Sequence, residues 1–381
     1  MVHPNDKGEA AEMVALGYKN WKQNQKDHDY LAGRKRGMSK RQTKELRDLP
    51  LVKLLNISIT LSPFLSVDTN QFQKSLLDGT EAYWLSLQGA SQRRLVPVLT
   101  KWHGQFCVKL NISNPEAVTW FLDQVGSLKA RLGMEYIFFE GAEENPVALN
   151  GGDQYIGQLA DVAAKIEEQT ILTVGTRSSH KPVFVQMPPL QSDWSSSGLK
   201  GLIPSLLHHS LLGYNFIIPD AVGGSLSGVL VTDAELFIRW LEIAAFLPVI
   251  SFETPPWVCG EDWVLNVTRT MIVHHQDFVV PLLTKYAGDW MTSGSPIYRP
   301  LWWLSPNDPV TFTINDQFLI GDEVLVAPVI ERGAVCRDIY LPDGGFQWQD
   351  TRNAQVFDGG TLLEEYPVAL EEVAIFLRWR S

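Results

Sequence analysis

The chain has 381 residues, of which 45% are hydrophobic and 20% are charged, and its formal net charge at pH 7 is −11. This length and composition are typical of a globular protein with one large domain or two ordinary ones, and such a chain can bury a sizeable core. The negative charge argues against nucleic acid as the main partner, because phosphate binding requires a basic surface.

Residues 1–50 differ from the rest of the chain, because they hold 11 Lys and Arg against 7 Asp and Glu. We expect a basic leader that is helical or disordered, with a nuclear signal or an anionic-surface patch as the alternatives. The first residues lack the profile of a signal peptide, and no run of 18 uncharged apolar residues predicts a membrane span in this chain.

From Leu51 onward, short apolar runs alternate with amphipathic stretches that are long enough for helices. The clearest helix start is Asn114 and Pro115, which supply an N-cap and a proline at the first helical position. The predicted strands are Leu54–Leu61, Ala82–Leu87, Val96–Leu99, Phe106–Leu110, Tyr136–Phe139, Ile171–Val174, Val183–Gln186, Phe216–Ile218 and Val249–Phe252. The predicted helices are Gln71–Leu77, 114–132, Gly157–Gln169, Leu199–Leu212 and Glu235–Phe246.

This alternation predicts a parallel sheet in residues 51–320, either a (β/α) barrel or an open doubly wound sheet. The pattern changes in residues 321–381, where short strands are separated by Gly, Pro and Asp turns. Such a pattern predicts a small all-β domain at the C-terminal end.

Glu140 is the first candidate for chemistry, because it directly follows the apolar strand Tyr136–Phe139. In a (β/α) barrel, residues just beyond the carboxyl end of a strand line the active site, where a carboxylate can act as nucleophile or base. The alternative is an acidic helix start without a catalytic role, since acids there are favoured by the helix dipole.

Asp193 is the second candidate, because it follows a predicted strand and stands beside Trp194. A neighbouring aromatic ring removes water from a carboxyl group and favours its protonated form, as a general acid requires. The surrounding Pro and Ser residues predict a loop, so an exposed loop acid without function is the alternative.

Asp220 follows the strand Phe216–Ile218 and precedes two glycines, which let the backbone approach a ligand closely. We expect its carboxylate to accept sugar hydroxyls, with a plain tight turn as the alternative. Trp102, Trp194 and Trp257 fall in predicted loops, where flat rings can stack on sugars, although core packing is the usual role of tryptophan.

Three N-glycosylation sequons begin at Asn56, Asn111 and Asn266 and suit a secretory or lumenal compartment. A lumenal protein with neither a signal peptide nor an anchor is expected to be a fragment, a splice form or a chain without its own N-terminus. The three cysteines lack CxxC spacing and no HExxH motif occurs, so we expect neither a metal nor another cofactor.

Three segments carry a family resemblance. They are Tyr298–Leu301 (YRPL), Asp316–Asp322 (DQFLIGD) and Leu325–Val329 (LVAPV). They resemble the end of the catalytic domain in glycoside hydrolase family 31, where the chain passes from barrel to β-sandwich. Pro219–Gly224 (PDAVGG) and Arg239–Leu241 (RWL) resemble the later aspartate motif of that family and the helix after it.

The resemblance covers roughly residues 54–381 and implies a (β/α)8 TIM-type barrel that lacks its first strands, followed by a small β-sandwich. It also implies hydrolysis of α-linked O-glycosides with retention by two carboxylates. Glu140 occupies the position where the family has its nucleophilic Asp, and Asp193 is the nearest carboxylate to the acid/base position. The Arg and His with which the family binds substrate have no visible counterpart in Ile250–Thr254.

The resemblance is nearest to an animal branch of type II membrane glycoproteins of the secretory pathway. We therefore expect a carbohydrate or glycoconjugate substrate. Two alternatives stay open: an inactive homologue that binds a glycan or another anionic small molecule, and a truncated isoform that does not fold stably.

Overall fold

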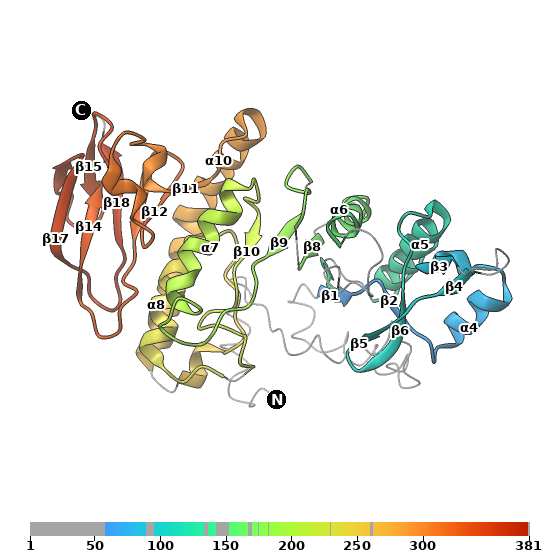
Figure 1. The fold of residues 1–381 in the computed structure, drawn as a ribbon. Coiled ribbons are helices and arrows are strands. Elements are labelled where there is room, and N and C mark those ends of the chain that lie inside the picture. Colours follow the sequence, from blue (N-terminus) through green and yellow to red (C-terminus); the bar gives the residue numbers. More distant parts are fainter. Residues whose placement is uncertain are drawn as a thin grey trace. The chain divides into compact units, whose positions relative to one another are not determined.

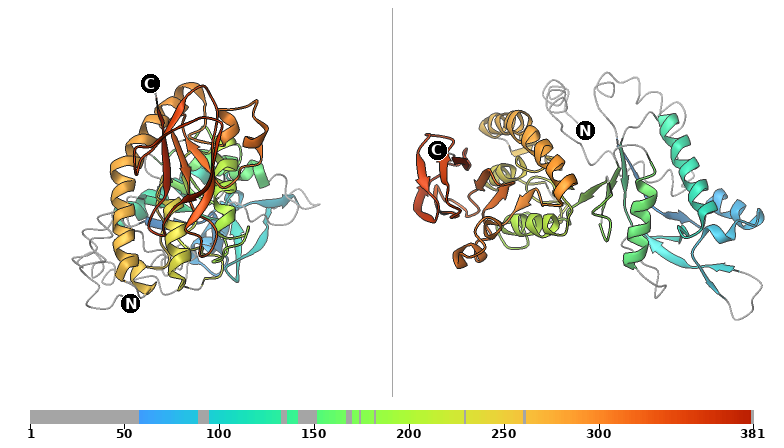
Figure 2. Two further views of the ribbon diagram at one scale, coloured as in Figure 1. Left: turned by 90° about the vertical axis from the view of Figure 1, so that its left-hand side faces the viewer. Right: turned by 90° about the horizontal axis from the view of Figure 1, so that it is seen from above.

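The described part of the chain forms two compact units, which meet in the sequence between Gln186 and Met187. They are shown in Figure 1 and, from two further sides, in Figure 2. The computed structural model describes residues 58–88, 95–132, 136–141, 152–166, 170–173, 175–181, 183–228, 230–259 and 262–379. The expected leader at residues 1–50 therefore lies outside the described residues, as does Asn56.

The first unit is built around a row of parallel strands. They follow in the order β1 (Ser58–Leu61), β7 (Tyr136–Phe139), β8 (Thr170–Leu172) and β9 (Phe184–Gln186). The described strands of this unit form an open row, so closure into a (β/α)8 barrel stays a prediction. The α/β character expected for this part of the chain is confirmed.

Helix α5 (Pro115–Leu132) starts where the sequence predicts, because Asn114 Oδ1 accepts a hydrogen bond of 2.9 Å from the Glu116 amide. Its apolar face is buried in one core with the residues of β7 and of α6 (Gly152–Ala163). This core includes Val118, Phe121, Val125, Ile137, Phe139, Tyr155 and Leu159.

A smaller antiparallel sheet accompanies these strands, in the order β2 (Phe64–Ser66), β6 (Gln105–Lys109) and β5 (Leu99–Trp102). A separate hairpin joins β3 (Ser86–Gln88) to β4 (Leu95–Pro97). Helix α4 (Asn70–Leu77) agrees with its prediction. The predicted strand Ala82–Leu87 is wrong in its first half, which is a 3-10 turn, η3 (Glu81–Tyr83).

The second unit begins with helices, of which α7 (Leu199–Leu211) and α8 (Ala234–Ala244) lie close to their predicted bounds. Between them is the short strand β10 (Ile217–Ile218). The predicted strand Val249–Phe252 is wrong, because only Phe252 has bridge geometry. The Ser251 carbonyl instead accepts a hydrogen bond of 2.8 Å from the amide of Val222. The remaining helical elements are η4 (Pro256–Cys259), α9 (Asp262–His274), the π-helical turn η5 (His275–Val279), α10 (Val280–Ser293), η6 (Leu301–Trp303) and η7 (Pro309–Phe312).

The C-terminal β domain has a six-stranded antiparallel sheet and a two-stranded one around a shared core. The large sheet has the order β11 (Tyr298–Arg299), β12 (Phe318–Ile320), β13 (Val324–Ala327), β18 (Ala374–Trp379), β15 (Gln347–Asp350) and β16 (Val356–Asp358). The small sheet pairs β14 (Cys336–Leu341) with β17 (Thr361–Pro367). Leu325, Trp348 and Phe376 from the large sheet meet Ile339 and Leu341 from the small one. The all-β character expected for residues 321–381 is confirmed, while the large sheet also includes β11 and β12 from before residue 321.

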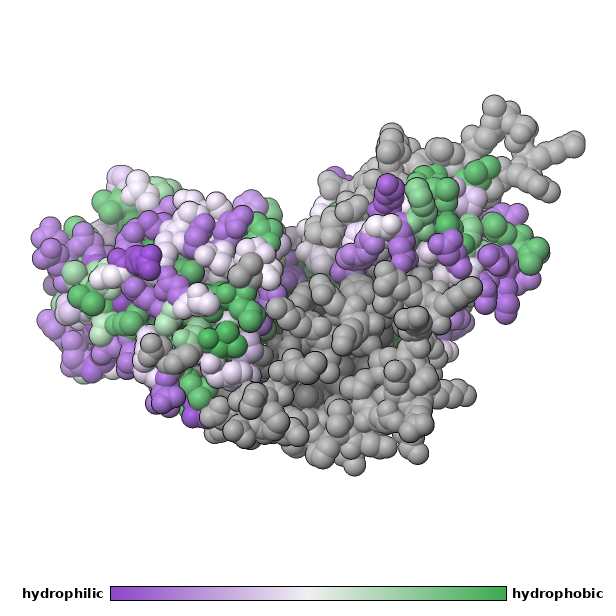
Figure 3. All heavy atoms as spheres, turned by 90° about the horizontal axis from the view of Figure 1, so that it is seen from below, coloured by the Kyte–Doolittle hydropathy of each residue, from purple (hydrophilic) through white to green (hydrophobic). Residues whose placement is uncertain are grey.

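No helix among the described residues is long and apolar enough to cross a membrane. The surface view in Figure 3 shows hydrophilic and hydrophobic residues mixed over the described part of each unit.

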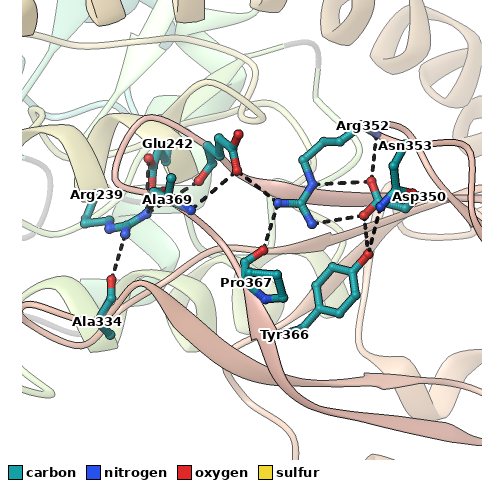
Figure 4. A network of polar contacts seen from close by, with 10 residues as sticks. Arg239, Glu242, Ala334, Asp350, Arg352, Asn353, Tyr366, Pro367 and Ala369 are labelled. Carbon is teal, nitrogen blue, oxygen red and sulfur yellow. Dashed lines mark hydrogen bonds and ion pairs between the residues drawn. The ribbon is translucent and has the colours of Figure 1, made fainter.

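A network of polar side chains stabilises the β domain (Figure 4). Asp350, which is fully buried, accepts hydrogen bonds of 2.9 Å from Arg352 Nη2 and 2.6 Å from the Tyr366 hydroxyl. Burial raises the pKa of the Asp350 carboxyl, but the hydrogen bonds from Arg352 and Tyr366 outweigh it, and the net effect is a lowered pKa. The ionised carboxylate therefore contributes stability above the pKa of an unfolded Asp, near 3.9.

Replacement Asp350→Asn is expected to lower the free energy of unfolding at pH 7 by about 1–3 kcal/mol, because donors from Arg352 lose their charged acceptor. The difference from the unsubstituted chain should shrink as the pH falls below about 4, where the carboxylate becomes protonated and its contribution is lost. Urea unfolding at pH 7, 5 and 3.5 measures both effects. A difference that stayed constant over this range would contradict the role of the ionised carboxylate.

Candidate functional site

Glu140 directly follows β7, whose four apolar residues are held between β1 and β8. Its amide donates a hydrogen bond of 3.0 Å to the carbonyl of Leu61, so the ladder between β1 and β7 continues up to this residue. The Glu140 side chain is 17% exposed. A partly buried carboxylate therefore stands at the carboxyl end of a parallel strand, where enzymes built on such strands place reacting groups.

Trp102 lies beside this position. Its ring stacks on Phe64, with centroids 4.7 Å apart and planes 20° from parallel. Gly141 has a φ of +78°, and a Cβ there would come within 2.8 Å of Phe64 and 3.0 Å of Trp102. Glycine thus lets the chain after Glu140 pass directly against the two rings. The structure brings the predicted Trp102 and Glu140 into one cluster of the first unit.

His103, which is not among the residues predicted from the sequence, belongs to the same cluster. Its Nε2 lies 3.4 Å from Glu140 Oε1, and its ring meets Trp102 edge-on with centroids 4.5 Å apart. The signal that could have found it is Gly104 between the predicted strands Val96–Leu99 and Phe106–Leu110, because glycine favours the positive φ angles of hairpin turns.

A buried cation completes this part of the first unit. Lys109 has no exposed surface, and its ammonium lies 4.1 Å from the centroid of the Tyr155 ring and 5.1 Å from that of Phe64. Cation–π contacts of this kind stabilise a desolvated ammonium. The ammonium of Lys109 therefore contacts the rings of Phe64 and Tyr155 inside the core.

Asp193 lies in the second unit, in an exposed loop between β9 and α7. Its Oδ1 accepts hydrogen bonds of 2.9 Å from the Ser195 amide and 2.6 Å from the Ser195 hydroxyl. Its backbone carbonyl accepts from the amide of Leu199, at the start of α7, at 2.9 Å. The predicted loop position is confirmed, and the carboxylate is held by its own turn.

Asp220 is only 1% exposed and follows β10 by one residue. Its two carboxylate oxygens accept four hydrogen bonds, from the amides of Leu190, Ala221 and Ser225 and from the Ser225 hydroxyl. Burial raises the pKa of this carboxyl above its ordinary value, although the four hydrogen bonds act in the opposite direction. The carboxylate joins the Asp193 loop to the turn after β10, and its expected contact with a sugar stays a prediction.

The Asp193 loop packs on this turn through glycine. Gly224 has a φ of +84°, and a Cβ there would lie 2.8 Å from the carbonyl oxygen of Gln191. The Ser192 hydroxyl donates a hydrogen bond of 3.1 Å to the Gly224 carbonyl. The sequence predicts that the paired glycines let the backbone approach a ligand. In the structure, Gly224 instead approaches the loop that contains Asp193.

Replacement Gly224→Ala is expected to destabilise the protein by more than the cost of a left-handed alanine, about 1–2 kcal/mol, because the new Cβ also meets Gln191. Gly228→Ala is the matched control, since Gly228 has a φ of +63° with no atom within 4 Å of the added Cβ. Thermal unfolding of both variants measures the difference. Equal losses would show that the contact with the Asp193 loop adds nothing.

The other predicted aromatic residues lie in the second unit as well. Trp194 is half-buried, and its indole Nε1 donates a hydrogen bond of 3.4 Å to Oδ2 of Asp233, the N-cap of α8. Trp257 is half-buried in the turn η4. Stacking of either ring on a sugar stays a prediction.

The sequons differ in exposure. Asn266 is exposed on α9, while Thr268, the third residue of its sequon, is fully buried. Asn111 is half-buried, and its amide donates a hydrogen bond of 3.2 Å to the carbonyl of Ala82. No group of three or more His, Cys, Asp or Glu residues that could hold a metal ion occurs within the described ranges.

Comparison with known proteins finds a family match at the C-terminal end of the chain. Residues 294–380 match the sequence model described as the glycosyl hydrolase family 31 C-terminal domain. The chain is 57% identical over 338 residues to the SITS-binding protein of Tetronarce californica, covering 87% of this chain and 48% of that protein. The chain is a homologue of the family 31 glycoside hydrolases.

Two further relatives agree with this assignment. The family 31 homologue is 33% identical over 303 residues to the myogenesis-regulating glycosidase of Mus musculus, which covers 75% of this chain and 42% of that protein. It also resembles a Flavobacterium johnsoniae GH31 dextranase solved with glucose, with a TM-score of 0.80 and 21% identity over 99% of this chain and 50% of the other. At that identity the likeness concerns the fold. The chain spans about half the length of the curated relatives that it matches.

Proposed function

We propose that this chain is part of a glycosidase that hydrolyses α-linked O-glycosides with retention of configuration. In this proposal the parallel strands belong to a (β/α)8 barrel of the family type. The substrate is a carbohydrate or glycoconjugate, and the protein works in the secretory pathway, to which the sequons at Asn111 and Asn266 are suited.

The observation that carries the proposal is the setting of Glu140. A retaining glycosidase needs a carboxylate nucleophile beside the anomeric carbon. Glu140 is an acid at the carboxyl end of a parallel strand, 17% exposed, and it stands in a cluster with Trp102 and His103. Aromatic rings favour the apolar faces of sugars, so the cluster combines a reacting group with a surface suited to the substrate.

Asp193 is proposed as the acid/base of the same reaction. It is an exposed carboxylate in a loop that Asp220 and Gly224 hold in place through hydrogen bonds and close packing. Asp220, Trp194 and Trp257 are proposed to contact the sugar.

The test is hydrolysis of p-nitrophenyl α-glucoside and α-galactoside by the purified chain, with the anomer of the first product followed by NMR. We expect the α-anomer to form first. A covalent cyclitol inactivator is expected to label Glu140, which peptide mass spectrometry identifies. A chain that neither hydrolyses these substrates nor reacts with the inactivator would overturn the proposal.

A second function, binding of an anionic small molecule without catalysis, is favoured by the relative at 57% identity, whose name describes it as a SITS-binding protein. Glu140 in place of the family's Asp supports the same alternative, since one extra methylene moves the carboxylate by about 1.5 Å. Calorimetric titration with SITS distinguishes the two functions. Saturable binding by a chain that hydrolyses no glycoside would establish the second one.

A further inference from the structure

The turn between β5 and β6 fixes the position of His103. Trp102 pairs with Gln105 across the hairpin, so His103 and Gly104 are its only two turn residues. Their φ angles are +46° and +76°, the left-handed geometry that a type I′ hairpin turn requires at both positions. Because both strands constrain such a turn, the backbone of His103 is fixed beside Glu140, and its side chain reaches the carboxylate.

We propose that His103 is a positioning residue that holds the carboxylate of Glu140 in its reactive orientation. This inference rests on the proposed function of Glu140. The imidazole Nε2 lies 3.4 Å from Glu140 Oε1, and an ionised carboxylate can only accept hydrogen bonds, so the proton of this contact belongs to Nε2. Contacts of this type are often long in the absence of substrate and shorten when it binds.

The need for such a residue follows from the length of Glu140. Glutamate has one more rotatable bond than aspartate, and a nucleophile displaced by about 1 Å loses on the order of 10²-fold in rate. A hydrogen bond to one carboxylate oxygen selects among the added rotamers. Glu140 therefore requires a restraint that a shorter Asp at this position does not.

The restraint is itself supported by packing. The His103 ring meets Trp102 edge-on at 4.5 Å, and Trp102 stacks on Phe64 at 4.7 Å. Phe64 belongs to β2, which pairs with β6, so the row of contacts ends in the antiparallel sheet. The His103 side chain is 61% exposed, so it holds Glu140 from the solvent side of the cluster.

Three substitutions separate the hydrogen bond from the packing. His103→Ala removes both, His103→Phe keeps an aromatic edge against Trp102 without a donor, and His103→Gln keeps a donor near the position of Nε2. We expect kcat to fall roughly 10- to 100-fold in the Ala and Phe variants, the range for a hydrogen bond to a charged group, with KM nearly unchanged. His103→Gln should stay within a few-fold of the unsubstituted chain. His180→Ala, exposed in the same unit, is the control and should change nothing.

A double-mutant cycle with Glu140→Asp tests the reason for the restraint. The shorter carboxylate is drawn back from His103, so His103→Ala should cost much less in that background. Equal losses in both backgrounds, or a Gln variant as impaired as the Ala variant, would overturn the proposal for His103 while leaving the glycosidase intact. A chain without any hydrolysis would overturn the proposed function instead.

A second measurement does not depend on turnover. In the histidine-labelled chain, the imidazole resonances of His103, assigned with the Gln variant, are expected to shift on Glu140→Gln and to stay constant on Asp123→Asn, which changes an exposed acid on α5. No shift on Glu140→Gln would mean that the imidazole does not contact this carboxylate in solution.

Discussion

Replacement of Glu140 by alanine is expected to lower kcat/KM for α-glycosides by roughly 10⁴-fold or more, as removal of a nucleophile does in other covalent mechanisms. The reason is that the glycosyl–enzyme intermediate can no longer form. Steady-state kinetics with an activated aryl glycoside measures the loss. Added azide should restore part of the rate in this variant, because a small anion can occupy the space that the carboxylate leaves, and the product should then be the β-glycosyl azide.

Two further variants serve as controls for Glu140. Glu140→Gln keeps the size and removes the charge, so it should be as inactive as the alanine variant. Glu140→Asp keeps the charge and withdraws it by about one bond, which is expected to lower kcat/KM on the order of 10²-fold. A Gln variant with normal activity would contradict a nucleophilic role for this residue.

Replacement of Arg239 by methionine is expected to lower the free energy of unfolding by about 3–5 kcal/mol, the usual cost of leaving one member of a buried ion pair without the other. Arg239 and Glu242 on α8 have no exposed side-chain surface, and Arg239 Nη1 lies 3.0 Å from Glu242 Oε2. Burial raises the pKa of the Glu242 carboxyl well above its ordinary value, while the charge of Arg239 acts in the opposite direction. Without Arg239, Glu242 would have to be protonated or remain charged in the core.

Arg239 also joins α8 to the β domain. Its guanidinium donates hydrogen bonds of 3.0 Å to the Ala369 carbonyl and 2.9 Å to the Ala334 carbonyl, as Figure 4 shows. Urea unfolding measures the loss, and the surface pair Lys285–Glu323, with side chains 51% and 40% exposed, supplies the control. Lys285→Ala should change stability by less than about 1 kcal/mol. Similar effects of the two substitutions would show that burial does not set the cost.

The elements that the sequence predicts correctly depend on residues that are neighbours in the chain. The bounds of β7 follow from four consecutive apolar residues, and the start of α5 follows from Asn114 and Pro115. Such signals depend on neighbours in the chain, so the sequence predicts them well. Val249–Phe252 is as apolar as a strand, yet it does not form one. Its Ser251 carbonyl accepts a hydrogen bond from Val222, in the turn after β10, instead of from a neighbouring strand.

The candidate site shows the same division. The sequence by itself determined a resemblance to the family, the all-β character of the C-terminal end, and an acid, Glu140, directly after a buried strand. Only the tertiary structure decided that His103 and Trp102, from a hairpin some 35 residues earlier in the chain, lie against Glu140, and that Asp220 is saturated by backbone and serine donors. Hydrogen bonds and ring contacts depend on which segments the fold brings within a few ångströms of one another. The periodicity of the sequence does not predict these long-range contacts.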